Sequence, residues 1–362
     1  MIGDCDDTYP IQPKRHTREF LREQAYLRPR TRLFQAVFRV RSIVSMGIHE
    51  FFQKEGFIYL HAPLFTDSDC EGAGETFQVT TQDLDKVAKT GQVDYSKDFF
   101  GKKVGLTVSG QFEAETFAQA FSKVYTFGPV FRADKSHTPY HLAEFWQIEP
   151  EVAFCDLDGI MDLSEKMTKS IIKYVLKYAK DEMKFLDKFV SPGLIQKLKK
   201  VETSKFKRVT YKECIDLLIK SGKKFEFEPK YGEDIAKEHE KYITEYFDCP
   251  IFITYWPKDI KAFYMKQMDD GTVAAADLEL PGVGETFGMS EREVDYDKLL
   301  TRMKELHMKI KDYEWYLKLR KYGTSKISGY GVGFDRLLMY ITGMDSIKDV
   351  IPYPRYDKYC EF

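Results

Sequence analysis

The amino-acid sequence predicts an α+β fold in which an antiparallel sheet is flanked by helices. The chain has 362 residues, 43% of them hydrophobic, which is enough to bury a large core. Runs rich in β-branched and aromatic residues recur in both halves, and they mostly do not alternate with helices as βαβ units do. We expect a basic N-terminal linker, residues 1–31, and one large domain, residues 32–362, with a mostly helical insertion at about residues 156–245.

In the first half, the clearest helix is predicted over residues 32–54. Apolar residues recur there at spacings of three and four, and Gly56 follows. The stretch "FIYLHAPLF" is typical of a strand that Pro63 interrupts or marks as an edge. Further strands are predicted at 104–111, at 123–133 and in "EFWQIEPEVAF", before a second amphipathic helix at 159–180.

In the second half, strands are predicted at "PIFITYWP", "AFYMKQ" and "TVAAADLELPGVGETFGM", then a helix at about 296–311. The last unit, "ISGYGVGFDRLLMYITGMDSIKDVIPYPR", indicates a glycine-rich turn that leads into a helix beginning near Phe334. No G-x-x-x-x-G-K-[ST] loop is present, which argues against a P-loop. Glycines 329, 331 and 333 do not fit a dinucleotide fingerprint either.

The net charge of −2 excludes a nucleic-acid binder that is basic overall, so any nucleic acid must meet a local patch. The best candidate is "PKRHTREFLREQAYLRPRTR", residues 13–32. Its basic residues are Lys14, Arg15, Arg18, Arg22, Arg28, Arg30 and Arg32. The alternative is a solvated helix face, because Glu19 and Glu23 dilute the charge.

The six cysteines form no C-x-x-C pair, which favours reduced thiols in a cytoplasmic protein over a zinc or redox site. The N-terminus has no basic-then-apolar signal, and no uncharged apolar run approaches the roughly 18 residues of a membrane span. We therefore expect no membrane association.

One hairpin carries the clearest chemistry, "FRADKSHTPYHLAEFWQIEPE", residues 131–151. An arginine held by a sheet, such as Arg132, is a rigid bidentate clamp for phosphate or carboxylate. Phe145 could stack on a flat ring, and His141 could contact a phosphate. The alternative is a surface hairpin in which Arg132 pairs with a glutamate.

A second arginine, Arg336, lies in "GVGFDR", in the first turn of the last predicted helix, where anions are favoured. Two separated arginines with one aromatic platform suit a nucleoside triphosphate. Asp277 and Glu285 could hold Mg²⁺ through one or two oxygens, with water and phosphate as the other ligands. The alternative is an acidic loop without a metal.

Three segments resemble the ordered motifs of class II aminoacyl-tRNA synthetases, specifically the asparaginyl member of the aspartyl/asparaginyl group. "GFIYLHAPLF" resembles motif 1, "FRAD…HLAEFWQIEPE" motif 2, and "GYGVGFDRLLMYITGMDSIKDVIPYPR" motif 3. Between them, "SDCEGAGETF" resembles the mobile substrate loop of this family, and "LTVSGQ" its amino-acid-binding strand. The resemblance covers residues 8–362.

The resemblance implies a six- or seven-stranded sheet, ATP and Mg²⁺ as cofactors, asparagine and tRNA as substrates, and a homodimer formed by residues 32–54 and the strand to Pro63. It also implies roles for individual residues. The catalytic residues would be Arg132 and Arg336. ATP would be bound by Arg132, Asp134, His141, Phe145, Glu285 and Arg336. The amino acid would be bound by Glu71, Gln111, Glu113, Glu115 and Arg292, and the metal by Asp277, Glu285 and Ser290.

The residues after Gln111 bear on the choice between asparagine and aspartate. Aspartyl enzymes of this group have a lysine three residues after the glutamine, where this chain has Ala114 between Glu113 and Glu115. A negative environment suits a carboxamide N–H₂ group and penalises a carboxylate. The sequence therefore favours asparagine.

Four departures from the family keep an alternative open. The family has an N-terminal anticodon-binding barrel, and this sequence begins at the linker that follows it. Tyr140 replaces a common arginine, Met289 and Glu291 stand where glycine and glutamine are usual, and Phe112 and Glu113 are atypical. The alternative is a stand-alone paralogue that passes an aspartyl or other acyl adenylate to ammonia, an amine or another non-tRNA acceptor. A catalytically silent binding module is a third reading, which the retained arginines oppose.

Overall fold

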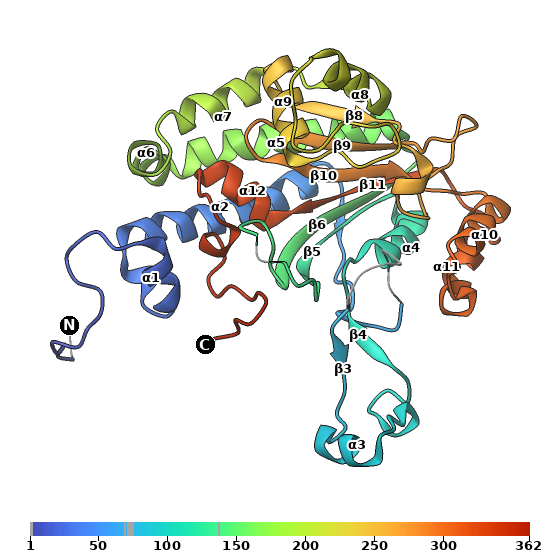
Figure 1. Ribbon diagram of the computed structural model, residues 1–362, viewed down its shortest axis with the longest axis horizontal. Coiled ribbons are helices and arrows are strands. Elements are labelled where there is room, and N and C mark those ends of the chain that lie inside the picture. Colours follow the sequence, from blue (N-terminus) through green and yellow to red (C-terminus); the bar gives the residue numbers. More distant parts are fainter. Residues whose placement is uncertain (1–2, 69, 71–75, 137) are drawn as a thin grey trace.

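An eight-stranded sheet forms the centre of the molecule in this computed structural model, which describes residues 3–68, 70, 76–136 and 138–362 (Figure 1). The strand order is β1-β5-β6-β11-β10-β9-β8-β7. The strands are β1 (Ile58–Tyr59), β5 (Lys123–Phe131), β6 (Glu144–Ala153), β7 (Lys207–Thr210), β8 (Ile251–Thr254), β9 (Ala275–Leu280), β10 (Gly284–Glu291) and β11 (Ile327–Gly333). This confirms the predicted α+β class with an antiparallel sheet flanked by helices.

The expected number of six or seven strands was too low, because the sheet has a short parallel strand at each edge. β1 pairs in parallel with β5, and β7 pairs in parallel with β8, whereas the pairs between them are antiparallel. β1 has only two residues, so most of "FIYLHAPLF" is irregular. β7 lies in the stretch expected to be a helical insertion, which therefore contributes a strand to the central sheet.

Helices cover the sheet on both faces and extend beyond its ends (Figure 1). On one face, α2 packs against α5, α6 and α12, and α5 packs against α6 and α7. α4 packs against β5 and β6. The helices are α1 (Arg18–Glu23), α2 (Arg32–Lys54), α3 (Leu84–Thr90), α4 (Gln111–Phe121), α5 (Leu157–Tyr178), α6 (Lys180–Phe189), α7 (Leu194–Thr203), α8 (Tyr211–Lys220), α9 (Lys237–Phe247), α10 (Tyr296–Glu305), α11 (Glu314–Leu319) and α12 (Phe334–Thr342).

The predicted helix at 32–54 is confirmed as α2. Its N-cap, Thr31, accepts a hydrogen bond from the Phe34 backbone N–H, and Gly56 follows the helix with φ +80°. Its apolar stripe is buried against α5 and the sheet: Val37, Val40, Val44 and Ile48 are fully covered. Burying one such side chain contributes about 1.5–3 kcal/mol, so this stripe fixes α2 to the sheet.

Three local predictions were wrong. The strand expected at 104–111 ends at Leu106 as β4 (Val104–Leu106), and Gln111 is the first residue of α4. "AFYMKQ" forms only isolated bridges, between Met265 and Arg292 and between Gln267 and Val273. The helix expected at 296–311 ends at Glu305 and is followed by a 3₁₀ turn, Ile310–Tyr313.

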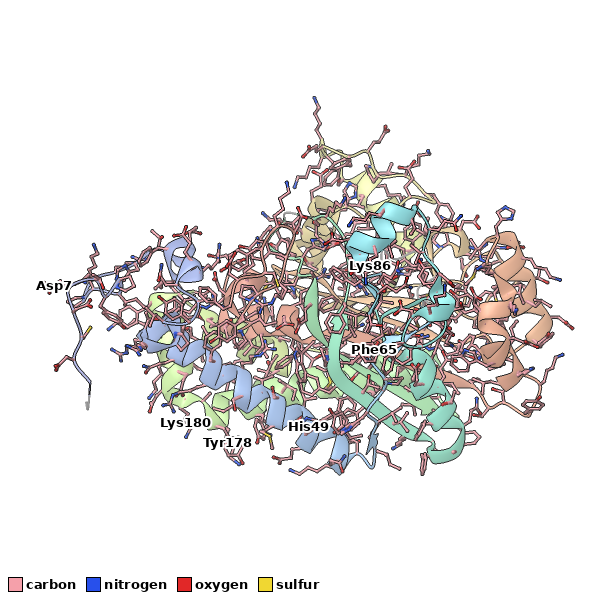
Figure 2. All side chains as sticks on the ribbon, turned by 90° about the horizontal axis from the view of Figure 1, so that it is seen from below. Asp7, His49, Phe65, Lys86, Tyr178 and Lys180 are labelled. Carbon is pink, nitrogen blue, oxygen red and sulfur yellow. The ribbon has the colours of Figure 1, made fainter. Side chains whose placement is uncertain are left out.

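A second, three-stranded sheet projects from the main body and carries α3 at its far end (Figure 1). It consists of β2 (Phe65–Thr66), β4 and β3 (Gln78–Val79), in the order β2-β4-β3. Phe65 of β2 and Lys86 of α3 are labelled in Figure 2, which views this projection from below. The chain returns from β4 directly into α4, which begins at the substrate cavity described below.

The N-terminal segment is tied to the end of the chain. Arg18 forms an ion pair with Asp345 at 2.6 Å, and Arg22 forms one with Asp349 at 2.7 Å. Arg28 is fully buried and donates to the carbonyl oxygens of Ile351, Pro352 and Lys348 at 2.6, 2.9 and 3.2 Å. The predicted basic patch is therefore reduced, and its exposed members are Lys14, Arg15, Arg30 and Arg32.

No disulfide links the six cysteines, all of which lie in the described part of the chain. Of the helices in the described part of the chain, none is both long enough and apolar enough to cross a membrane.

Candidate active site

A cavity of about 320 Å³ opens over the middle of the sheet, where β6, β11 and β10 lie side by side. The loop after β5 and the first turn of α12 form its walls at one end, and the start of α4 lies at the other. The cavity brings together eight of the predicted site residues: Gln111, Arg132, Asp134, His141, Phe145, Glu285, Arg292 and Arg336.

Strand β6 supplies the floor of the cavity. Successive side chains of a strand point to opposite faces, so residues two apart share one face. Phe145, Gln147, Glu149 and Glu151 all line the cavity in this way. The sequence reasoning gave a role only to Phe145, although the same period of two marks the other three.

The glycines of β11 leave room for these side chains. A Cβ atom on Gly331 would lie 2.6 Å from Gln147 Nε2, and one on Gly329 would overlap the Glu151 carboxylate. The two glycines pair with β10 and lie on the cavity face of the sheet. Glycines 329 and 331 are therefore required by close side-chain approach, which explains a pattern that fits no dinucleotide fingerprint.

One end of the cavity is built for a flat ring and an anion. The Arg132 guanidinium lies over the Phe145 ring, with Cζ 5.5 Å from the ring centroid. Arg336, in the first turn of α12, donates to the Glu285 carbonyl oxygen at 3.3 Å. The neighbouring Asp335 is fully buried, pairs with Arg41 of α2 and accepts from the Trp146 N–H at 2.9 Å. These contacts fix the start of α12 against β6 and so fix Arg336.

His141 lies at the same end, in the loop between β5 and β6. Its Nδ1 lies 3.1 Å from Ser136 Oγ and close to Thr138 Oγ1. Partial burial, with Arg336 and Arg132 nearby, lowers the pKa of His141 below its ordinary value. The ring is therefore neutral at pH 7 and above.

The other end of the cavity contains a buried arginine, Arg292, with its partners already in place. Its Nε donates to Glu151 Oε2 at 3.1 Å, its Nη2 pairs with Glu151 Oε1, and its Nη1 donates to Ser290 Oγ at 2.6 Å. Burial acts to lower the pKa of Arg292, but the Glu151 carboxylate outweighs it and raises that pKa. The guanidinium stays charged, and two of its five N–H groups remain for a ligand.

The remaining residues predicted to bind the amino acid are placed differently. Gln111 lines the cavity from the first turn of α4. Glu115, one turn later, lies behind the cavity wall and is only 1% exposed. Glu113 points to a separate depression, with Phe65, Lys102 and Trp315. Glu71 lies outside the described residues, as does most of "SDCEGAGETF".

Three carboxylates share one face of the β9–β10 hairpin: Asp277, Glu279 and Glu285. A bulge between Glu285 and Phe287 shifts the register, so that Glu285 faces Glu279 and Gly288 faces Asp277. Burial, opposed by Lys261 and reinforced by the Glu285 charge, raises the pKa of Asp277 to about 7. Burial and the charges of Glu240 and Glu285 raise the pKa of Glu279 well above its ordinary value.

Of these three, only Glu285 lines the cavity; Asp277 forms an ion pair with Lys261. Ser290, predicted beside them, is fully buried and accepts from Arg292 instead. In the described part of the chain, no three Asp, Glu, His or Cys side chains are arranged to hold a metal ion by themselves.

The residues that depart from the expected pattern are accommodated without disturbing the site. Tyr140 and Met289 line the cavity. Glu291 pairs with Lys266 at 2.6 Å, so it adds no unpaired charge beside Arg292. Phe112 is buried and stacks on Tyr316 of α11, with ring centroids 4.2 Å apart.

A family model described as "tRNA synthetases class II (D, K and N)" matches residues 17–357. The chain belongs to this family of class II synthetases. It is 56% identical to the asparagine–tRNA ligase of Acholeplasma laidlawii, over 99% of this chain and 78% of that protein. It is also 56% identical to that of Clostridium botulinum, over 99% and 79%.

Solved structures of this family share the fold. Asparaginyl-tRNA synthetase from Pyrococcus horikoshii, complexed with asparaginyl-adenylate, has a TM-score of 0.83 and 33% identity, covering 95% of this chain and 74% of the other. The Entamoeba histolytica enzyme, also with asparaginyl-adenylate, has a TM-score of 0.84 and 27% identity, covering 99% and 76%. The class II fold expected from the three motifs is confirmed.

Proposed function

We propose that this class II synthetase activates asparagine with ATP and transfers it to tRNA. An oxygen of the asparagine α-carboxylate attacks the α-phosphorus of ATP. The new P–O bond forms as the bond to the pyrophosphate leaving group breaks, which gives asparaginyl-adenylate. A ribose hydroxyl at the 3′ end of tRNA then attacks the acyl carbon, and AMP leaves.

One observation carries the proposal: a single cavity has two chemically different ends. Arg132, Phe145 and Arg336 suit a triphosphate and its base at one end. Arg292 suits a small polar side chain at the other. Relatives that are 54–56% identical over nearly the whole chain are named asparagine–tRNA ligases.

The residues act by position and charge. Arg132 and Arg336 bind phosphate oxygens and stabilise the charge that develops at phosphorus, while Phe145 stacks on the adenine. Arg292 donates to the side-chain oxygen of asparagine, and Gln111 accepts from its ammonium group. Asp134 and His141 contact the rest of ATP. No nucleophile from the protein is needed, because the substrate carboxylate attacks directly.

The cavity fits Mg²⁺ through few protein ligands. The raised pKa values of Asp277 and Glu279 indicate crowded carboxylates beside Glu285, and Glu279 Oε2 is buried without a hydrogen-bond partner. A bound divalent cation would offset the repulsion among the Asp277, Glu279 and Glu285 carboxylates. Glu285 would hold it, with Asp277 behind, and phosphate and water would complete the shell. When bound, Mg²⁺ neutralises phosphate charge.

The alternative, an aspartyl-adenylate enzyme that uses ammonia, is not favoured. The two relatives described above are named asparagine–tRNA ligases, and Glu291, one of the departures that prompted the alternative, is paired with Lys266.

Pyrophosphate exchange with each of the twenty amino acids tests the proposal. We expect exchange with asparagine far above exchange with aspartate, and charging of tRNA with asparagine. A site that binds a polar group can reject a mismatched analogue by about 10⁴-fold. Preferred exchange with aspartate, with ammonia-dependent release of asparagine and no tRNA charging, would support the alternative instead.

We also propose a homodimer formed by α2 and the segment from β1 to Pro63. This side exposes Met46, Ile58 and Leu64 and contains a cavity of about 260 Å³ that Pro63 and Trp146 help to line. Figure 2 shows α2 open along this side, with His49 near its C-terminal end. A self-complementary surface gives a closed dimer. A purely monomeric species by light scattering at micromolar concentration would refute it.

The exposed residues Lys14, Arg15, Arg30 and Arg32 are a proposed contact for tRNA phosphates. A cytoplasmic location is a further proposal, which the lack of disulfides in the described part of the chain supports.

A further inference from the structure

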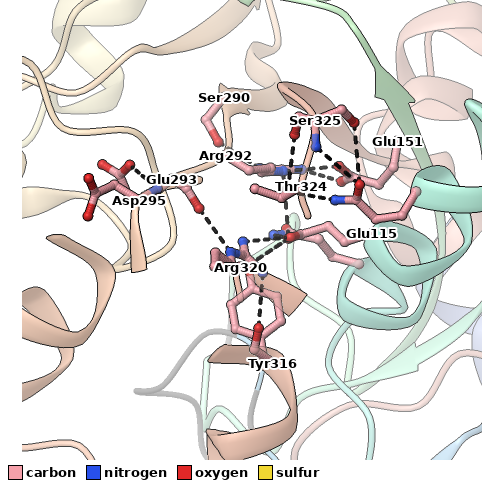
Figure 3. A network of polar contacts seen from close by, with 12 residues as sticks. Glu115, Glu151, Ser290, Arg292, Glu293, Asp295, Tyr316, Arg320, Thr324 and Ser325 are labelled. Carbon is pink, nitrogen blue, oxygen red and sulfur yellow. Dashed lines mark hydrogen bonds and ion pairs between the residues drawn. The ribbon is translucent and has the colours of Figure 1, made fainter. Parts of the chain in front are cut away.

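Glu115 of α4 is the centre of a buried polar network behind the amino-acid end of the cavity (Figure 3). Its Oε1 accepts from Gln111 Nε2 at 3.0 Å and from the Tyr316 hydroxyl at 2.8 Å. Its Oε2 accepts from Arg320 Nη2 at 2.9 Å. Glu115 does not line the cavity, so it cannot read the substrate as the sequence suggested. It contacts residues that do.

Glu115 determines which way the Gln111 amide points. An ionised carboxylate accepts hydrogen bonds and donates none, so the amide nitrogen of Gln111 must face it. The amide oxygen of Gln111 is then left to accept a hydrogen bond, and Gln111 lines the cavity. An acceptor at this point suits the ammonium group of an amino acid.

The same network holds Arg292. Glu151 takes two of its N–H groups, and Glu115 Oε1 lies 3.9 Å from its Nε. Arg320 is the second cation of the network, with side-chain exposure of 2%. Two carboxylates, Glu115 and Glu151, therefore face two guanidinium groups, so each cation of the network has a carboxylate partner. Without Arg320, Arg292 would be the only cation of the network left to balance two carboxylates.

α11 holds Arg320 and Tyr316 in place. Arg320 Nε donates to the Glu293 carbonyl oxygen at 3.0 Å, and its Cζ lies 4.0 Å from the Tyr316 ring centroid (Figure 3). Phe112 of α4 also stacks on the Tyr316 ring, with the two ring centroids 4.2 Å apart. The hydroxyl of Tyr316 is thereby aimed at Glu115.

We propose that Glu115, Tyr316 and Arg320 are positioning residues for amino-acid binding, and that the charge of Glu115 sets the selectivity for asparagine over aspartate. They orient Gln111 and Arg292 from behind the cavity and keep the buried charge balanced. A neutral carboxamide then meets guanidinium groups whose charges are already paired, whereas the side-chain carboxylate of aspartate would add an unbalanced negative charge. This inference rests on the proposed activation of asparagine.

Three substitutions separate charge from orientation. Glu115→Gln keeps an acceptor for Gln111 and leaves the network with one excess positive charge. We expect the preference for asparagine over aspartate in pyrophosphate exchange to narrow by about tenfold or more, the scale of one charge at an effective dielectric near 20. Tyr316→Phe and Arg320→Lys leave the net charge unchanged. They should raise KM for asparagine about three- to tenfold and keep the asparagine-to-aspartate ratio.

Tyr316→Phe and Arg320→Lys are each compared with a buried control of the same residue type. Arg302→Lys changes an arginine of α10 that donates to the Lys258 carbonyl oxygen at 2.9 Å, and Tyr211→Phe removes a hydroxyl that donates to the Glu233 carbonyl oxygen at 2.6 Å. Neither contacts Glu115. Both controls should keep wild-type KM for asparagine, and KM for ATP should stay within about twofold in all five proteins, since the ATP end is not touched. Thermal unfolding of each variant identifies any that fails to fold.

The outcomes are distinct. If the wild type prefers asparagine but Glu115→Gln keeps the wild-type ratio and the two α11 variants match their controls, the inference is wrong and the proposed function stands. If the wild type prefers aspartate, both are overturned. If Glu115→Gln does not fold, the inference is judged on KM for asparagine in the other two variants. A KM raised above that of the matched control in Tyr316→Phe and Arg320→Lys supports the inference, and an unchanged KM overturns it.

Discussion

The two ends of the cavity are built in different ways. At the ATP end, Phe145 and Arg132 lie in one hairpin, and Arg336 follows a single glycine-rich strand. At the amino-acid end, the decisive pairs join residues 141, 201 and 205 positions apart: Arg292 with Glu151, Tyr316 with Glu115, and Arg320 with Glu115. Each ATP-end residue lies in a motif that is recognisable locally in the sequence, whereas the residues of the amino-acid end are paired with one another across the fold before any ligand arrives. The two ends should therefore respond differently to mutation.

The largest effect is expected from Arg292→Ala, which damages stability and activity together. It leaves the buried Glu151 carboxylate without its partner, and breaking a buried ion pair costs about 3–5 kcal/mol. Asparagine-dependent exchange should be lost or show a strongly raised KM. Denaturant unfolding is the measurement, with the surface variant Arg208→Ala as control, since its exposed pairs with Asp158 and Asp162 contribute under about 1 kcal/mol each.

At the ATP end, Arg132→Ala and Arg336→Ala should each lower adenylate formation by about 10²–10³-fold with the fold intact. Each removes a charged donor to phosphate in the transition state. Single-turnover kinetics at saturating ATP measure the loss, and unfolding curves should match the wild type. A folded variant with a wild-type exchange rate would mean that phosphate binds elsewhere.

Gly329→Ala should affect only the amino-acid end. The added methyl group overlaps the Glu151 carboxylate, so the Arg292–Glu151 pair must shift, at a cost of about 1–3 kcal/mol. KM for asparagine should rise while KM for ATP does not. Gly128→Ala in β5 is the control for stability, because no heavy atom lies within 4 Å of the added position. Equal unfolding free energies for the two variants would contradict the packing argument.

The smallest effect concerns pH at the ATP end. Because the pKa of His141 is lowered, its ring is neutral at pH 7 and gains a positive charge only at lower pH. KM for ATP should therefore fall modestly as the pH drops below the lowered pKa of His141, and His141→Gln should remove this change. The contribution of His141 to the free energy of unfolding has the opposite dependence on pH. It is fully present above the ordinary histidine pKa of about 6.5 and is lost as the pH falls through the lowered pKa. A flat wild-type profile would remove His141 from the phosphate site.

The contrast also explains what could be predicted from the sequence. α2 and the strands β9 and β10 were predicted correctly, and the proposed ATP-end residues lie together in one cavity, because helical periodicity, runs of strand-forming residues and the arginine-bearing motifs are local signals. The placement of Glu115 was wrong, because it depended on a strand that is in fact the first turns of α4. Arg320 and Tyr316 gave no sequence signal at all. Their role appears only when α11 packs against α4, which no local pattern encodes.

The position of β11 has a consequence for synthesis on the ribosome. This strand lies between β6 and β10 and joins two halves of the sheet, yet it follows the other seven strands along the chain. Until it emerges, the nascent chain presents two half-sheets with unpaired edges, which are prone to associate with other chains. The two half-sheets and the active site are therefore completed only after β11 has been made, and a chain truncated before Ile327 would expose both edges permanently.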